Sequence, residues 1–155
     1  MNYRIDENDR LIVSLQIDDL PHRATNIVPK YCVIHYTGGN KLSSSIKHLR
    51  RMGFSYQLLI DRDGSVTQGT PLSKRASHSG YSNWHGRDWL NDFGIGISLN
   101  NMGYLDRHGA EFFNTDSSGR ISSPVFSKDQ VVVSSHWNKH NGGKAMGWEK
   151  YGSPE

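Results

Sequence analysis

The stretch that decides the fold is Ile27–Thr37, which reads IVPKYCVIHYT and runs into a pair of glycines. It is rich in β-branched and aromatic residues, which predicts a buried strand followed by a tight turn. With the period of two of a strand, His35 shares one face with Tyr31 and Val33. The end of a strand beside a glycine turn is a place where a rigid scaffold can present a base or a metal ligand to a cleft. A hydrogen-bonded core histidine is the alternative interpretation.

The flanking segments predict that strands alternate with helices. Ser43–Met52 is expected to be a short helix, because its serines can cap the start and Ile46, Leu49 and Met52 form one apolar stripe. A second helix is expected over Ser127–His140, which begins with capping-box spacing. The other expected elements are a hairpin formed by Ser55–Asp61 and Ser65–Gly69 around Asp63-Gly64, and a buried strand at Gly94–Asn100, whose glycines indicate close approach of another backbone.

This alternation predicts the α/β class, with a single domain built on a central mixed β-sheet flanked by helices. Residues 1–26 are expected to be an N-terminal extension, and residues 27–155 the domain itself. Residues 102–126 are polar and dotted with glycines, so they are expected to be a surface insertion between elements.

The composition excludes several classes of protein. A chain of 155 residues, 35% of them hydrophobic, can form one globular domain but not two of ordinary size. No apolar run approaches the roughly 20 residues that cross a bilayer, and a net charge of +3 is too small to indicate nucleic-acid binding. The single cysteine, Cys32, excludes an internal disulfide. The N-terminus has no secretory signal, so the chain as written is expected in the cytoplasm, or in the periplasm or outside the cell if another route delivers it.

Two further segments combine residue types that suit a binding or catalytic site. SYQLLIDRDG at 55–64 contains Tyr56, which is either a packed aromatic residue or a hydroxyl facing a cleft. HSGYSNWHGRDWLNDFGIGIS at 78–98 places His78 in a loop of small residues that can approach a ligand closely. In the same segment Trp84 or Trp89 can stack on a sugar or peptide face. A purely structural loop is the alternative for this segment.

The order of these segments resembles the zinc-dependent N-acetylmuramoyl-L-alanine amidases of the type 2 amidase family, whose fold is shared with peptidoglycan recognition proteins. VIHYT at 33–37, SYQLLIDRDG at 55–64 and the 78–98 block carry the resemblance. It implies that His35 is the first zinc ligand and that Tyr56 assists catalysis near the metal. It also implies a loop that shapes the substrate cleft, formed by His78, Gly80, Trp84, Asn91 and Asp92.

The sequence departs from this family pattern at several positions. Gln57 stands where many members have histidine, and Ser98 where many bacterial members have a glutamate. The C-terminal segment with the second and third zinc ligands has no counterpart, so the chain is expected to lack the last helix and the ligand segment. Three explanations stay open: a fragment, a degenerate amidase, or new ligands such as His136 and His140, whose spacing suits one face of a helix.

The resemblance implies a hydrolase that cleaves the amide between N-acetylmuramic acid and L-alanine with a zinc-activated water. Zinc is the implied cofactor, and peptidoglycan or a muropeptide is the implied substrate. The alternative is a catalytically inactive peptidoglycan-binding or structural module on the same fold.

Overall fold

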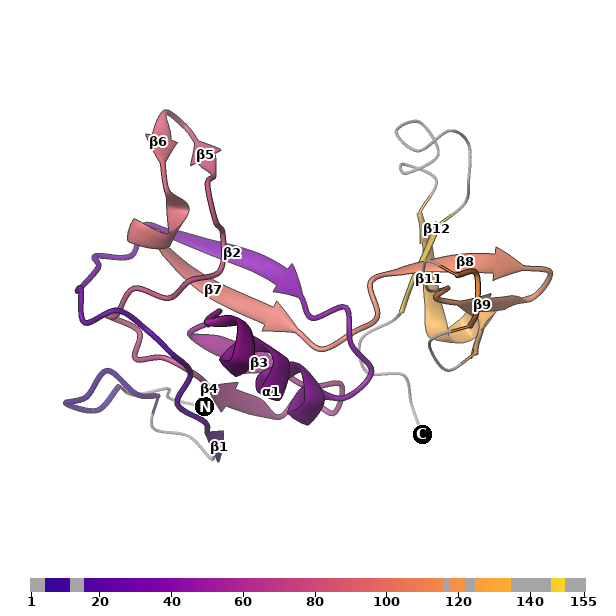
Figure 1. Ribbon diagram of the computed structural model, residues 1–155, viewed down its shortest axis with the longest axis horizontal. Helices are drawn as coiled ribbons and strands as arrows, with labels where there is room; N and C mark the ends of the chain where they lie inside the picture. The colour runs from indigo at the N-terminus through magenta and orange to yellow at the C-terminus, as the bar shows by residue number, and fades with distance from the viewer. Residues whose placement is uncertain (1–4, 12–15, 116–117, 122–124, 135–145, 150–155) are drawn as a thin grey trace.

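The protein is described by a computed structural model that covers residues 5–11, 16–115, 118–121, 125–134 and 146–149. The described part contains two five-stranded sheets and a two-stranded arm (Figure 1). The first sheet is mixed, because β3 and β4 are antiparallel while the other neighbouring strands are parallel. The mixed sheet expected from the sequence is therefore confirmed. In spatial order its strands are β1 (Gln16–Ile17), β4 (Val66–Gln68), β3 (Leu58–Ile60), β7 (Gly94–Leu99) and β2 (Tyr31–Tyr36).

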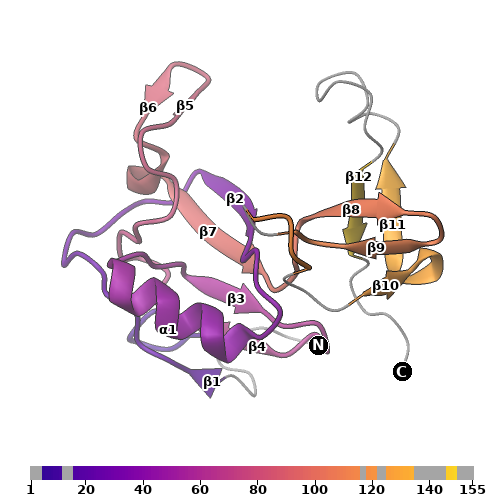
Figure 2. The same cartoon turned by 45° about the vertical axis from the view of Figure 1, so that its right-hand side comes forward.

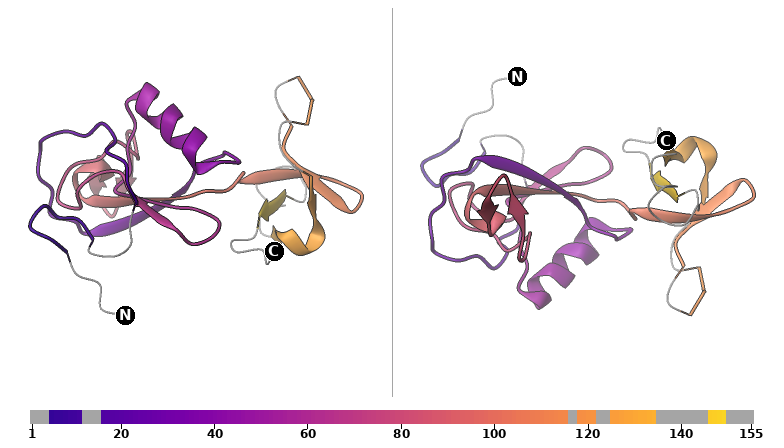
Figure 3. Two further views of the ribbon diagram at one scale, coloured as in Figure 1. Left: turned by 90° about the horizontal axis from the view of Figure 1, so that it is seen from below. Right: turned by 90° about the horizontal axis from the view of Figure 1, so that it is seen from above.

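β2 has the two faces that the sequence predicted, but the expectation of a buried strand is wrong, because β2 lies at the edge of the sheet and its residues are half-buried or exposed. Exposure alternates along the strand, with His35 on the half-buried face and Ile34, which is 59% exposed, on the other. The register places His35 beside Ser98 of β7 and Ser98 beside Leu59 of β3, so these three side chains share a face. Leu59 belongs to the cluster that packs against helix α1 (Leu42–Met52). Helix α1 therefore covers the face that carries His35, and Figure 3 shows it on one side of the sheet.

Helix α1 confirms the predicted helix but differs from it at its start and along its stripe. Its N-cap is Lys41 and makes no side-chain capping hydrogen bond, so the serines do not cap the helix. Its buried residues are Leu42 and Ile46, whereas Met52, the last residue of the helix, is 51% exposed. Gly53 ends the helix with a φ of 71°, a left-handed conformation that glycine adopts without a Cβ clash.

The predicted hairpin is confirmed by the antiparallel pairing of β3 with β4. At its turn the Gly64 amide donates to the Asp61 carbonyl at 3.0 Å, and the Ser65 amide donates to the Asp63 side chain at 2.8 Å. The turn is closed because Gly64 takes a φ of 82°.

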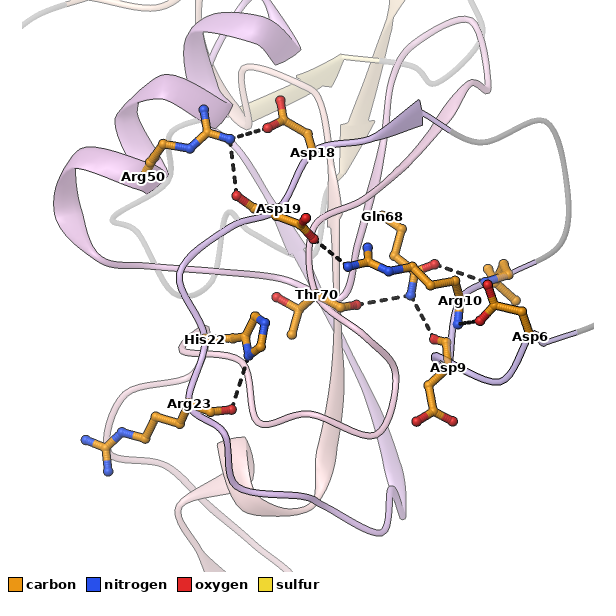
Figure 4. Close-up of polar contacts among 11 residues, drawn as sticks. Asp6, Asp9, Arg10, Asp18, Asp19, His22, Arg23, Arg50, Gln68 and Thr70 are labelled. Carbon is orange, nitrogen blue, oxygen red and sulfur yellow. Dashed lines mark hydrogen bonds and ion pairs between the residues drawn. The ribbon is translucent and has the colours of Figure 1, made fainter.

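Part of the expected N-terminal extension lies against the first sheet, because β1 pairs in parallel with β4. Gln68, which is fully buried, holds the preceding segment: its amide nitrogen donates to the Asp9 carbonyl at 3.1 Å, and its oxygen accepts from the Leu11 amide at 3.0 Å. Arg50 reaches from α1 to Asp18 in an ion pair (Figure 4). These contacts attach residues on both sides of β1 to the sheet and the helix.

The segment expected as a polar insertion instead begins a second sheet, which lies to one side of the first (Figure 2). Leu105 and Phe112 are 1% exposed and form a cluster with Met102 and Phe126. The exposed residues 106–111 form the turn side of the β8–β9 pairing, and the buried residues on either side of them form a core of their own. The strands in spatial order are β10 (Phe126–Ser127), β9 (Glu111–Phe113), β8 (Tyr104–His108), β12 (Met146–Glu149) and β11 (Val131–Ser134).

The helix predicted over Ser127–His140 is wrong for its described part. The Ser127 amide does donate to the Gln130 side chain at 2.9 Å, as capping-box spacing suggests, but this bond starts only a short 3-10 turn (Lys128–Gln130). The chain then enters β11, because three consecutive valines favour a strand over a helix. Residues 135–140 lie outside the described residues. Among the described residues, no helix is both long and apolar enough to span a bilayer.

Candidate active site

The structure brings together three residues that the sequence singled out: His35, Tyr56 and His78. His35 lies near the end of β2, Tyr56 lies two residues before β3, and His78 comes from the loop that follows β4. The Nε2 atom of His35 is 3.1 Å from the Nδ1 atom of His78. The His35 ring centroid lies 5.1 Å from that of Tyr56 and 5.2 Å from that of His78. Three polar rings from distant parts of the chain thus meet on the face of the sheet that α1 also covers.

Two glycines of β7 allow close approach, Gly96 of the His78 ring and Gly94 of a backbone carbonyl. A Cβ atom at Gly96 would lie 2.6 Å from the ring atoms Cγ and Cδ2 of His78, closer than carbon atoms approach. A Cβ at Gly94 would lie 2.9 Å from the Leu90 carbonyl oxygen and 3.6 Å from the His78 ring. The close approach predicted from these glycines is therefore made by a backbone at Gly94 and by an imidazole at Gly96.

Asn91 fixes the backbone of the His78 loop. Its side-chain oxygen accepts hydrogen bonds from the His78 amide at 2.9 Å and from the Ser79 amide at 2.8 Å. The Ser79 hydroxyl lies 2.7 Å from His78 Nδ1. Asn91 is only 5% exposed, so it is placed to hold the loop rather than to touch a ligand directly.

Burial keeps both histidines neutral. It lowers the pKa of His35 below the ordinary value of an imidazole, since the charged form loses its hydration. For His78, burial and then the positive charge that His35 would carry lower the pKa to about 4. That pKa already includes an opposing rise from the hydrogen bond with the Gly94 backbone and a smaller lowering by nearby Arg75. At neutral pH each ring therefore has one nitrogen that can accept a proton or bind a metal.

Tyr56 keeps its proton under the same conditions. Burial raises the pKa of its hydroxyl, and the proximity of Ser98 opposes this rise. Ser98 Oγ nevertheless makes no hydrogen bond of normal geometry, so the contact with Tyr56 is weak. The site thus combines two neutral imidazoles with a protonated phenol, which can accept and donate protons respectively.

The buried side chain of Gln57 connects two segments of the site by hydrogen bonds. Its residue type alone did not reveal this role. Its side chain is fully buried, donates to the Lys74 carbonyl at 2.9 Å and accepts from the Gly96 amide at 2.7 Å. Gln57 therefore links the loop that leads to His78 with β7, the strand whose Gly96 packs against the His78 ring. The signal in the sequence was a polar residue that alternates with apolar ones just before a strand.

The other sequence-predicted site residues lie around this cluster. Asp92 forms an ion pair with Arg75, so its carboxylate is already engaged. Gly80 is exposed and takes a φ of 55°, which turns the chain toward the arm formed by β5 (Asn83–Trp84) and β6 (Arg87–Asp88). Trp84 is 56% exposed on this arm, where its ring contacts the neighbouring His85. The arm extends away from the sheet (Figure 1), so Trp84 is not part of the three-ring cluster.

The described side chains do not complete a zinc site. A catalytic zinc site needs three protein ligands and an open position. Within the described ranges, no group of three or more His, Cys, Asp or Glu side chains is placed to hold a metal ion. His35 and His78 offer two nitrogens that face each other. The alternative ligands His136 and His140 lie outside the described residues.

Comparison with known proteins gives the family. Residues 24–140 match the family model described as N-acetylmuramoyl-L-alanine amidase (Amidase_2). The chain therefore belongs to the type 2 N-acetylmuramoyl-L-alanine amidase family.

Curated relatives carry this class of activity in their names. The chain is 32% identical over 117 residues to the 1,6-anhydro-N-acetylmuramyl-L-alanine amidase AmpD of Haemophilus influenzae, covering 72% of this chain and 64% of the relative. It is 33% identical over 113 residues to AmpD of Salmonella typhimurium, covering 70% and 59%. The chain thus spans less than two thirds of the length of these relatives.

Solved structures give similar matches. A crystal structure of an AmpD derivative has 27% identity and a TM-score of 0.49, over 63% of this chain and 65% of that one. A complex of the Escherichia coli amidase AmiD with anhydro-N-acetylmuramic acid-L-Ala-D-gamma-Glu-L-Lys has 27% identity and a TM-score of 0.48, over 66% and 41%.

Proposed function

We propose that this chain is an N-acetylmuramoyl-L-alanine amidase, which hydrolyses the amide between N-acetylmuramic acid and L-alanine of a muramyl peptide. The observation that carries the proposal is the convergence of His35, Tyr56 and His78 within the residues that match the family. The names of the relatives support the choice of bond, and the AmiD complex supports a substrate of the type anhydro-muramyl-L-Ala-D-γ-Glu-L-Lys.

The chemistry of amide hydrolysis fits what these three side chains can do. Water must lose a proton as it attacks the carbonyl carbon, and the leaving amine must gain one. Neutral His35 and His78 each have a nitrogen able to accept a proton, because their pKa values are lowered. The Tyr56 hydroxyl, whose pKa is raised, can donate a hydrogen bond to the oxygen that becomes negative during the attack.

Zinc binding is the part of the proposal that needs an independent measurement. We propose His35 as a zinc ligand because of its match to the family motif and its position at the end of β2. Zinc would lower the pKa of a bound water and polarise the carbonyl. Metal analysis of the chain and of His35→Ala is the test: stoichiometric zinc in the wild type that is lost in the variant supports the assignment. Zinc retained by His35→Ala would remove this residue from the site.

The proposed activity is tested by incubating the chain with anhydro-muramyl tripeptide, in zinc and in chelator, and by detecting free tripeptide with mass spectrometry. Tyr56→Phe should lower kcat by about 100-fold, the scale of losing one donor to a developing oxyanion. Tyr31→Phe is the control: it removes a tyrosine hydroxyl from the start of β2, the strand that carries His35, and leaves the three rings in place. It should leave kcat unchanged. Absence of product from the zinc-loaded chain, together with retention on insoluble cell wall, would favour an inactive binding module instead.

A further inference from the structure

A cavity of about 450 Å³ lies between α1 and the β3–β4 hairpin, and none of the three rings lines it. Leu42 and Ile46, which are both buried, give it an apolar floor. Its volume is in the range of small-ligand pockets. The polar lining residues used below are Lys41, Lys47, Arg50, Asp61, Thr67 and Asn100.

The sheet wall of this cavity carries a buried hydroxyl without a partner. Thr67 of β4 is 3% exposed and lies beside Leu59 in register, so its side chain is on the face that α1 covers. Among the described residues, nothing makes a hydrogen bond with the Thr67 hydroxyl. Buried hydroxyl groups in proteins are normally satisfied. The hydroxyl therefore points to a polar ligand in the cavity that it lines.

A carboxylate on the same wall is held in a fixed orientation. The Oδ1 atom of Asp61 accepts from the Arg62 amide at 2.8 Å and from the Asn100 side chain at 2.6 Å. Asn100 is 1% exposed and also accepts from the Thr37 hydroxyl at 3.0 Å, so a buried network holds the carboxylate. Within the described ranges, Asp61 Oδ2 has no such partner, and it can accept from hydroxyl groups of a ligand.

The helix wall of the cavity is basic. Lys41 and Lys47 are exposed, and in the described part of the chain neither side chain has an ion pair or a hydrogen bond. Arg50 also lines the cavity but is already paired with Asp18 (Figure 4). Two unpaired ammonium groups match the charge of about −1.5 to −2 on a phosphate monoester better than the single charge of a carboxylate.

We propose that this cavity binds a small hydroxylated phosphate of the hexose phosphate type. The phosphate lies toward the ammonium groups of Lys41 and Lys47. The sugar hydroxyls bind the Asp61 carboxylate and the Thr67 hydroxyl on the opposite wall. The proposal goes beyond the amidase function and does not rest on it, because the cavity shares no residue with the three rings.

The first test is isothermal titration calorimetry of the chain with glucose 6-phosphate, inorganic phosphate and glucose as probes. Glucose 6-phosphate should bind at least about fivefold more tightly than either of the others, since it alone carries groups for both walls. Lys47→Gln should raise its Kd by about threefold to fivefold, the scale of losing an exposed charge interaction. Lys30→Gln, which removes an exposed lysine outside the cavity, should leave the Kd unchanged. Equal affinity for the three probes, or no binding of glucose 6-phosphate, overturns the proposal.

The second test examines the sheet wall. Thr67→Val removes the hydroxyl at nearly constant volume and should raise the Kd for glucose 6-phosphate by about threefold to tenfold. The urea midpoint of the free variant should not fall, because no hydrogen bond within the protein is broken. Asp61→Asn keeps the Oδ1 acceptor and should weaken glucose 6-phosphate but not inorganic phosphate. A lower midpoint of Thr67→Val with an unchanged Kd, or equal weakening of both probes by Asp61→Asn, overturns the assignment of this wall.

A third measurement needs no variant. Glucose 6-phosphate is titrated into the 15N-labelled chain, and the shifts of backbone amides are mapped. Shifts at Leu42, Ser43 and Thr67 support the proposal, whereas shifts confined to the β5–β6 arm overturn it. Hydrolysis of muramyl peptides by the chain, or its absence, bears on the proposed function alone.

Discussion

His78 should make the stability of the fold strongly dependent on pH between about 4 and 6.5. Its pKa is lowered from 6.5 to about 4 in the folded chain, mainly by burial. A group whose folded pKa is lowered binds fewer protons in the native state than in the unfolded state, so acid favours unfolding. The stability contribution is complete above pH 6.5 and is lost as the pH falls toward 4. For this shift the loss between pH 7 and pH 4 is about 3 kcal/mol, and about 2 kcal/mol is already lost at pH 5.

The assay is urea unfolding of the chain at a series of pH values, followed by tryptophan fluorescence, for the wild type and His78→Gln. The variant has no imidazole to protonate, so its free energy of unfolding should fall about 3 kcal/mol less than that of the wild type between pH 7 and pH 4. His22→Gln removes an exposed imidazole and should follow the wild-type curve. If wild type and His78→Gln lose stability in parallel, the argument from burial of His78 is refuted.

Three further changes test the packing around the site and the second sheet. Gly96→Ala places a methyl group within 2.6 Å of the His78 ring and should cost about 1–3 kcal/mol of unfolding free energy. NMR titration should also show that the pKa of His78 rises, because a displaced ring is less buried. Gln57→Leu leaves the Gly96 amide and the Lys74 carbonyl without these partners and should lower the free energy of unfolding in urea by about 2–4 kcal/mol. An unchanged urea midpoint would mean that water replaces both hydrogen bonds. Phe112→Ala should cost about 3–5 kcal/mol but act locally, so amide exchange should accelerate in β8 and β9 and stay slow in β2 and β7.

Much of the first sheet could be predicted from the sequence, since its signals are local. The β-branched run ending in His35, the Asp63-Gly64 turn and the glycine-spaced strand at 94–99 each match one element of the structure. In these segments the intrinsic preference of the residues agrees with their tertiary surroundings, so local reasoning was sufficient.

The second sheet was missed for a physical reason. Its buried residues, such as Leu105 and Phe112, are separated by charged and glycine residues on an exposed face, and this pattern is also typical of a loop. Pairing between β8 and β12 joins residues about forty positions apart, a distance that local patterns do not encode. At 127–134 the capping signal and the valine run indicated different structures, and the valines determined the outcome.

The sequence singled out the three rings of the candidate site, but it did not predict the contacts that hold them in place. His35, Tyr56 and His78 were found because their motifs are specific in order and spacing. That Asn91 would bind backbone amides, and that Ser98 would lie beside His35 in register, depends on strand pairing, which the sequence does not specify.

The hydrogen bonds that Gln57 makes beneath this site do not depend on pH, because an amide side chain does not titrate. A histidine at this position would change its hydrogen bonding when protonated and would alter the seat of the His78 ring. Gln57 keeps the same donor and acceptor at every pH, so the distance between the Gly96 amide and the Lys74 carbonyl is held constant while the rings above change charge. The acid response is thereby confined to the face that carries the three rings, and recovery after a return to neutral pH should need no rearrangement of the strand beneath them.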